Sequence, residues 1–219
     1  MIKALFIGYT GAIIQHRGKD FEQLMNRIVS HSDFKNTEEA GKWITNELHE
    51  LEKQSTGENY ICFDDICMKA LEDAEREHNL KDNKEQLHTL AQNYLMYAPV
   101  YDDVHEMMTL TSLPLYVVTD CGEDFVRVCM RRNNLHPFGI YTSERVKCYK
   151  PDSEIYRKAA EEYGFQPEDI LYIGASLEDV KGAASAGMKS ILVDRNRRHR
   201  DADVQRVRSL VEILAHMEK

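Results

Sequence analysis

The chain lacks any apolar run near the roughly 20 residues that a helix needs to cross a bilayer, so the sequence predicts no membrane segment. It also lacks an excess of positive charge: the formal net charge of −9 argues against general binding to nucleic acids or anionic membranes. The basic run 195–200 is interpreted as a solvated loop. The N-terminus carries a single Lys and no small-residue cleavage site, which favours a buried first strand over a signal peptide.

Paired cysteines in metal-site spacing are lacking as well. The five cysteines are odd in number, which with their spacing argues against a zinc site and favours reduced thiols in a cytoplasmic protein. They are Cys62, Cys67, Cys121, Cys129 and Cys148. Cys121 follows a strand-end motif described below, and we interpret it as a small buried side chain.

Strand and helix patterns alternate over most of the sequence. Ile2–Ile7 predicts a buried strand that ends in a glycine-bearing loop, and further strands are predicted at 115–118, 170–173 and 190–193. Helices are predicted through Phe125, Val128 and Cys129, at about 153–163 and 177–186, and from Ser209 to the end; Gly187 supplies a C-terminal stop. The alternation predicts an α/β fold with a Rossmann-like parallel sheet covered on both faces.

An all-helical stretch interrupts this alternation. Residues 18–95 contain no convincing strand and show four amphipathic helical patterns, which predict a small bundle with Leu24, Trp43 and Leu90 in its core. Asn36 or Thr37 is the expected N-cap of the second helix. We therefore expect a core of residues 1–14 and 96–219, with residues 15–95 inserted as a helical-bundle cap domain.

Polar residues follow the predicted strands, and in a parallel α/β sheet ligands bind outside the carboxyl ends of the strands. Thr119 and Asp120 follow one strand, Lys150-Pro151-Asp152 lies in a connecting loop, and the run 174–179 follows another strand. A hydroxyl, an ammonium and carboxylates would meet there, and these groups suit phosphate and Mg²⁺.

In order and spacing these motifs resemble the haloacid-dehalogenase-like (HAD) hydrolase superfamily, mainly its phosphatase branch, over essentially the whole chain. The four matching segments are Phe6-Ile7-Gly8-Tyr9-Thr10-Gly11-Ala12, Val117-Val118-Thr119-Asp120, Lys150-Pro151-Asp152 and Gly174-Ala175-Ser176-Leu177-Glu178-Asp179. The resemblance implies a helical cap over the active site and makes Lys150 the catalytic lysine of the third motif.

Three positions depart from the family pattern. Where the family has the nucleophilic Asp, this chain has Gly8, so no covalent intermediate can form there. Thr10 replaces the usual acid/base Asp, and Ala175 replaces a carboxylate that binds Mg²⁺. Three departures together are typical of a naturally lost site rather than of one inactivating substitution.

The resemblance implies Mg²⁺ as the cofactor, but few ligands remain for it. Asp179 is left as a vestigial ligand, with Glu178 and the Thr10 carbonyl as weak additions, so we expect weak or absent magnesium binding. Thr119, Asp120 and Lys150 remain at matched positions and predict a residual phosphate-binding site. Asp120 and Glu178 are not expected to replace the missing acids, because neither sits where in-line attack would occur.

The leading hypothesis is a catalytically impaired HAD-like protein, derived from a small-molecule phosphatase, that binds a phosphorylated metabolite or a partner beneath its cap. One alternative is an active phosphatase with a non-standard mechanism. Dehalogenation is disfavoured because it also needs the missing Asp and because the Tyr-Gly-Thr ending is absent. A further alternative is a non-catalytic interaction module, with large exposed apolar patches as its hallmark.

Overall fold

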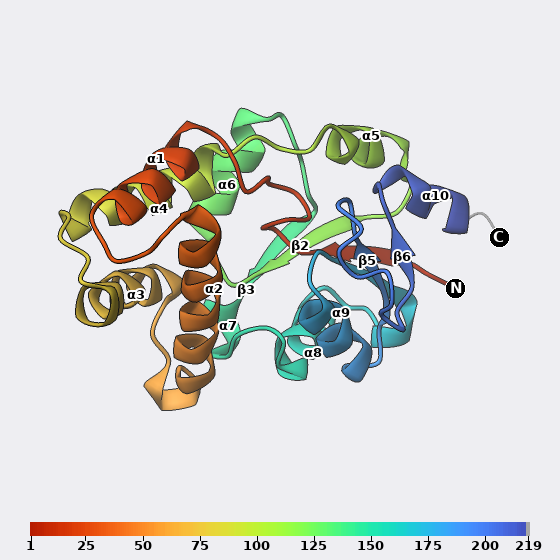
Figure 1. Ribbon diagram of the computed structural model, residues 1–219. Helices are drawn as coiled ribbons and strands as arrows, with labels where there is room; N and C mark the ends of the chain where they lie inside the picture. The colour runs from red at the N-terminus through yellow and green to blue at the C-terminus, as the bar shows by residue number, and fades with distance from the viewer. Residues whose placement is uncertain (218–219) are drawn as a thin grey trace.

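The computed structural model describes residues 1–217, which form a parallel six-stranded sheet with helices on both faces and a helical lobe at one end (Figure 1). The strand order is β3-β2-β1-β4-β5-β6, and every adjacent pair is parallel. The strands are β1 (Ala4–Ile7), β2 (Leu115–Thr119), β3 (Gly139–Thr142), β4 (Ile170–Gly174), β5 (Lys189–Val193) and β6 (Arg206–Val207). The predicted α/β fold with a helical insertion is confirmed.

Two strands were not expected from the sequence. β3 has four residues, one of them Gly139, and β6 has only two. Segments this short carry too few side chains for a periodic pattern, and pairing with β2 and β5 is what makes them extended. The four predicted strands are confirmed, because continuous apolar runs such as 4–7 are buried on both faces of the sheet.

The sheet is covered by helices from the second half of the chain and by α5 (Asp102–Leu110), which the sequence did not indicate. Predicted helices appear as α8 (Ser153–Glu162), α9 (Leu177–Ser185) and α10 (Val211–Met217); the expected continuation of the last helix through 218–219 lies outside the described residues. Gly187 follows α9 with a φ of +93°, which confirms the expected stop. The helix predicted through Phe125, Val128 and Cys129 is α6 (Glu123–Arg132), and the remaining elements are α7 (Ser143–Val146) and the 3₁₀ turn η2 (Pro167–Asp169).

The helical lobe follows β1 and forms the cap. It consists of α1 (Lys19–Ser30), α2 (Thr37–Gln54), the turn η1 (Gly57–Asn59), α3 (Phe63–His78) and α4 (Lys84–Tyr97). Leu24 and Leu90 are buried in its core and Trp43 packs against it, as predicted. The Asn36 side chain accepts a hydrogen bond from the Glu39 amide at 2.9 Å, so Asn36 is the N-cap. The boundary expected at residue 95 falls inside α4, whose Leu95 packs with the sheet core.

β2, β1 and β4 are neighbours in the middle of the sheet, and their carboxyl ends face the cap (Figure 1). The arrangement brings the four sequence motifs to one place. In the described range 1–217, no helix combines the length and the apolar character needed to cross a membrane.

Candidate functional site

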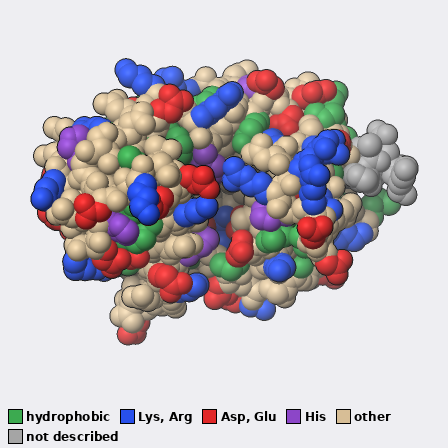
Figure 2. Space-filling model, viewed as in Figure 1, with side chains coloured by type: hydrophobic (Ala, Val, Ile, Leu, Met, Phe, Trp, Pro, Cys, Tyr) green, Lys and Arg blue, Asp and Glu red, His purple; other side chains and the backbone are tan. Residues whose placement is uncertain are grey.

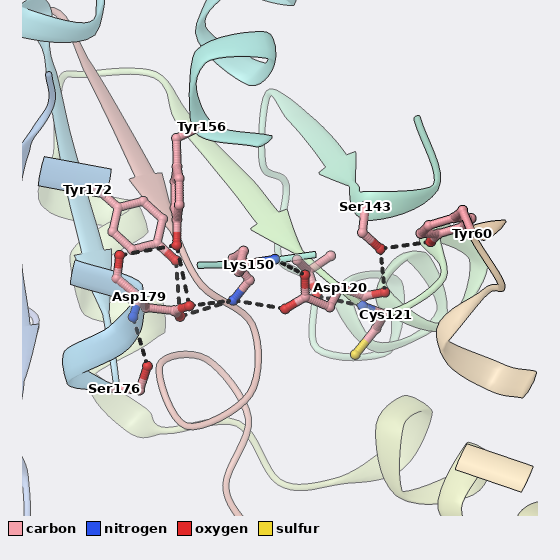
Figure 3. Close-up of polar contacts among 10 residues, drawn as sticks. Tyr60, Asp120, Cys121, Ser143, Lys150, Tyr156, Tyr172, Ser176 and Asp179 are labelled. Atoms are coloured by element: carbon pink, nitrogen blue, oxygen red, sulfur yellow. Dashed lines mark hydrogen bonds and ion pairs between the residues drawn. The ribbon is translucent and has the colours of Figure 1, made fainter. Parts of the chain in front are cut away.

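Lys150 is the centre of the site. Its Nζ lies 3.1 Å from Oδ1 and 2.9 Å from Oδ2 of Asp179, and 3.4 Å from Oδ2 of Asp120 (Figure 3). The Lys150 side chain is 9% exposed and both carboxylates are 16% exposed. Burial opposes the charge of Lys150, but the two carboxylates outweigh burial and raise the pKa of the lysine well above its usual value. Lys150 is therefore a buried ammonium held by two acids.

Asp179 is fixed from several sides. Ser176 is the N-cap of α9, and its Oγ accepts a hydrogen bond from the Asp179 amide at 3.1 Å. Tyr172 on β4 donates to Asp179 Oδ2 at 3.2 Å, and Tyr156 on α8 donates to the Asp179 carbonyl at 3.1 Å (Figure 3). Burial raises the pKa of both tyrosines, so both hydroxyls stay protonated and act as donors. These contacts hold the carboxylate in its orientation toward Lys150.

Gly8, at the end of β1, lies beside this network. A Cβ atom at this position would stand 3.2 Å from the Tyr172 hydroxyl and 3.5 Å from Asp179 Oδ2. A side chain at position 8 would thus enter the space between β1 and the Asp179 carboxylate. The structure places Gly8 where the first motif was expected, with tyrosine and aspartate oxygens bordering the space that it leaves.

The loop of the first motif rests against the fourth motif through small residues. Gly11 has a φ of +76°, and a Cβ there would come within 3.0 Å of the Ala175 methyl carbon. Arg195 donates to the carbonyls of Gly11 and Ala12 at 3.2 Å and pairs with Asp103 at 2.8 Å. The side chain of Arg195 is 14% exposed, so its interpretation as part of a solvated loop was wrong. The sequence concealed this contact because its partners lie more than 90 residues away.

Thr119 is the last residue of β2 and Asp120 follows it, and both side chains accept hydrogen bonds from backbone amides of the protein. Thr119 Oγ1 accepts a hydrogen bond from the Cys121 amide at 3.1 Å, and Asp120 Oδ1 accepts one from the Lys150 amide at 3.0 Å. Burial is the main cause that raises the pKa of Asp120, and nearby Asp179 acts in the same direction. Cys121 is buried as expected, and burial raises its pKa to about 12, so its thiol is neutral. All five cysteines are free.

Thr10 and Glu178 belong to the first and fourth motifs, but both residues are exposed. The structure therefore brings together Gly8, Thr119, Asp120, Lys150, Ala175 and Asp179, and leaves Thr10 and Glu178 at its margin.

The cap contributes residues that sequence reasoning missed. The segment after α2 docks on the core: Gly57 N donates to the Lys147 carbonyl at 2.9 Å, and the Tyr149 hydroxyl donates to the Ile61 carbonyl at 2.7 Å. Tyr60 stacks on Tyr149 with ring centroids 5.2 Å apart. We call this segment, residues 55–61, the docking loop.

The docking loop is linked to the end of β2 by a short hydrogen-bond chain. The Tyr60 hydroxyl lies 3.0 Å from Ser143 Oγ, which in turn donates to the Asp120 carbonyl at 3.0 Å (Figure 3). Just before this loop, Glu52 of α2 is buried at 8% exposure. Its position four residues after Leu48, on the apolar face of the predicted helix, was the available signal.

The donor set does not fit Mg²⁺. Gly8 and Ala175 offer no side-chain oxygen, and both carboxylate oxygens of Asp179 face the ammonium of Lys150. Magnesium requires several oxygen ligands in near-octahedral geometry. Within residues 1–217, no three His, Cys, Asp or Glu side chains are grouped so that they could hold a metal ion.

Comparison with known proteins gives a consistent family signal. The family model described as haloacid dehalogenase-like hydrolase matches residues 34–193. (S)-2-haloacid dehalogenase 4A of Burkholderia cepacia is 22% identical over 158 residues, which cover 70% of this chain and 68% of that protein. Enolase-phosphatase E1 of Persephonella marina is 41% identical over 104 residues, covering 45% of this chain and 46% of the relative, so this match spans less than half of either protein.

Solved structures show the same fold. The L-2-haloacid dehalogenase from Xanthobacter autotrophicus superposes with a TM-score of 0.81 at 16% identity, covering 100% of this chain and 99% of that one. The HAD-hydrolase YfnB from Bacillus subtilis, solved bound to magnesium, gives a TM-score of 0.77 at 16% identity, with coverages of 100% and 99%. Because the relatives include both dehalogenases and phosphatases, the assignment to the phosphatase branch stays a prediction.

Proposed function

This chain belongs to the haloacid dehalogenase-like hydrolase family, and from that membership we propose that it is a non-hydrolytic member, a binding protein that keeps the fold and cap of the family without its covalent chemistry. The observation that carries the proposal is Gly8 at the position of the family nucleophile. Beside it, the positive charge of Lys150 is balanced by the carboxylates of Asp179 and Asp120.

Covalent chemistry of this family needs a carboxylate that attacks the substrate, and glycine supplies no atom for the attack. The carboxylates nearest to Gly8 are committed elsewhere: Asp179 holds Lys150 and receives the Tyr172 hydroxyl. The side-chain oxygens that would bind a metal beside a nucleophile are also missing, because Gly8 and Ala175 have none. These features support the loss of both the phosphatase and the dehalogenase route.

The surface supports retention of a binding role. Figure 2 shows the molecule hollowed along the line where the cap meets the sheet domain. A small phosphorylated molecule remains the ligand expected from the sequence, but such an anion would have to draw Lys150 away from Asp179. Since two carboxylates already surround this one ammonium, their negative charges would repel a further anion.

A hydrolase that uses Asp120 is the second candidate, because this carboxyl group has a raised pKa and touches Lys150. A pKa raised by burial is a feature of carboxyl groups that act as general acids. Its two oxygens already meet the amide and the ammonium of Lys150, which leaves it poorly placed for attack.

An activity assay tests the proposal. The natural protein, the Asp120→Asn variant and the Gly8→Asp/Ala175→Asp double variant are compared with Mg²⁺ against an aryl phosphate, a panel of phosphorylated metabolites and 2-chloropropionate. We expect no turnover by the natural protein, and turnover by the double variant would show that only the side chains were lost. Turnover by the natural protein that disappears in Asp120→Asn would overturn the proposal in favour of the second candidate.

A further inference from the structure

Glu52 brings a third carboxyl group to the site, and it comes from the cap rather than from the sheet. It lies in the last turn of α2 and is 8% exposed. Asp120, Lys150 and Asp179 are all close enough for their charges to act on the Glu52 carboxyl. The site therefore combines three carboxyl groups with one ammonium.

The Glu52 carboxyl has no partner among the side chains that the structure describes. No hydrogen bond or ion pair with residues 1–214 reaches either of its oxygens, although the residue is only 8% exposed. Within the same residues, every side-chain oxygen or nitrogen that is fully shielded from solvent has a hydrogen-bond partner. The Glu52 oxygens must therefore still touch solvent-accessible space. A buried acid with open oxygens is what a ligand-binding group requires.

Hydrogen bonds at the end of α2 fix the backbone around Glu52. The Ser55 amide donates to the Glu52 carbonyl at 3.1 Å, and Ser55 Oγ accepts the Ile61 amide at 2.7 Å. The docking loop that follows is bound to the core through Lys147 and Tyr149. The end of α2 and the docking loop are thus tied to each other and to the core, which fixes the backbone that carries Glu52.

The charges of the groups around Glu52 indicate which kind of ligand the site would bind. The other titratable groups around Glu52 are neutral near pH 7, because burial raises their pKa values; they are Cys67, Cys121 and Tyr149. Lys150 is the positive charge among these neighbours, and it is already paired with Asp179 and Asp120. Burial raises the pKa of Glu52 itself to about 9, so the empty site keeps this acid protonated. An incoming cation would allow it to ionise.

We propose that the site beneath the cap binds a small molecule through a primary ammonium group, which pairs with Glu52 and with Oδ2 of Asp120. This inference rests on the proposed function, because it names the ligand class of the non-hydrolytic protein. Asp120 Oδ2 already meets Lys150 Nζ at 3.4 Å, but a carboxylate oxygen has two lone pairs and can accept a further donor. An ammonium has three donors to share between two carboxylates.

Isothermal titration calorimetry with n-butylamine and putrescine tests the inference, with n-butanol and inorganic phosphate as the uncharged and anionic controls. Binding should release a proton from the acid, so its heat should depend on the ionisation enthalpy of the buffer. Affinity should increase from pH 6 to pH 8.5, by at most about tenfold per pH unit for one proton. Glu52→Gln should weaken amine binding at least tenfold and abolish the proton release.

The matched control is Glu58→Gln, which makes the same substitution at an exposed residue of the neighbouring turn η1. This variant should bind amines like the natural protein. Equal weakening by both variants would overturn the inference, because it would indicate diffuse attraction to a protein of net charge −9. If Glu52→Gln does not fold, Glu52→Asp keeps the acid and should bind more weakly with proton release retained; unchanged affinity in Glu52→Asp would count against the site.

Two further outcomes are decisive. No binding of either amine, or binding of phosphate instead of amines, would refute the ammonium site and leave the non-hydrolytic proposal intact. Turnover by the natural protein in the activity assay would refute the non-hydrolytic proposal whatever the amines do. The two failures are therefore distinguishable.

Discussion

The ammonium of Lys150 lies 2.9 Å and 3.1 Å from the two carboxylate oxygens of Asp179, and this contact joins the third motif to the fourth. Since Lys150 and Asp179 are 29 residues apart and both side chains are largely buried, the pair holds the Lys150 loop against α9. Removal of the Asp179 carboxylate leaves the buried Lys150 ammonium with only the longer contact to Asp120 at 3.4 Å, which is more costly than the loss of an exposed ion pair.

Asp179→Asn should therefore lower the free energy of unfolding by about 3 kcal/mol. Urea denaturation at pH 7 measures the change. Glu38→Gln is the control, because it breaks the solvent-exposed pair with Lys42 and should change the free energy of unfolding far less. Similar losses in the two variants would show that the Lys150–Asp179 pair is solvated.

The stability of the protein should decrease as pH rises between about 4.5 and about 9. The pKa of Glu52 is about 9 in the folded protein against 4.5 for the ordinary group, so the folded state binds more protons in this window. The stabilising contribution is complete below pH 4.5 and is lost as pH passes the folded pKa. One proton corresponds to a slope of about −1.4 kcal/mol per pH unit.

Urea denaturation from pH 5 to pH 9 measures this slope. Glu52→Gln should flatten it, because the amide does not titrate, whereas Glu58→Gln should leave it unchanged. An identical pH profile for the natural protein and Glu52→Gln would mean that Glu52 titrates normally and is not buried in solution.

The docking loop should open when its hydrogen bonds to the core are removed. Tyr149→Phe deletes the bond to the Ile61 carbonyl and leaves that acceptor with only the longer bond from Ser55 Oγ at 3.2 Å, at a cost of about 1 kcal/mol. Amide hydrogen exchange should become faster in residues 55–61, with little change in the sheet. Tyr97→Phe, at a 44% exposed tyrosine, is the control; unchanged exchange in the loop would show that other contacts hold the cap.

Gly8 and Tyr172 should be energetically coupled. Gly8→Ala places a methyl group 3.2 Å from the Tyr172 hydroxyl, which must shift by a few tenths of an ångström and strain its bond to Asp179. We expect each of Gly8→Ala and Tyr172→Phe to cost about 1 kcal/mol, and the double variant to cost clearly less than the sum. A double-mutant cycle by urea denaturation measures the coupling, and strict additivity would place the two groups out of contact.

The sequence by itself determined the α/β fold, the helical insertion and the meeting of the four motifs. Apolar runs such as Ala4–Ile7 and the helical periodicity around Leu24, Trp43 and Leu90 are local signals, and the strand-end rule turns them into one shared edge. The proposed loss of the nucleophile also rests on sequence alone, because glycine at position 8 has no reactive atom in any fold.

Only the tertiary structure decided what occupies the site. The pairing of Lys150 with Asp179, the approach of Tyr172 to Gly8 and the arrival of Glu52 from the cap each join different elements of the fold. The short strands β3 and β6 likewise exist through pairing with their neighbours. Side-chain charge and burial in this site depend on distances across the folded chain, and a linear pattern of residue types contains no such distances.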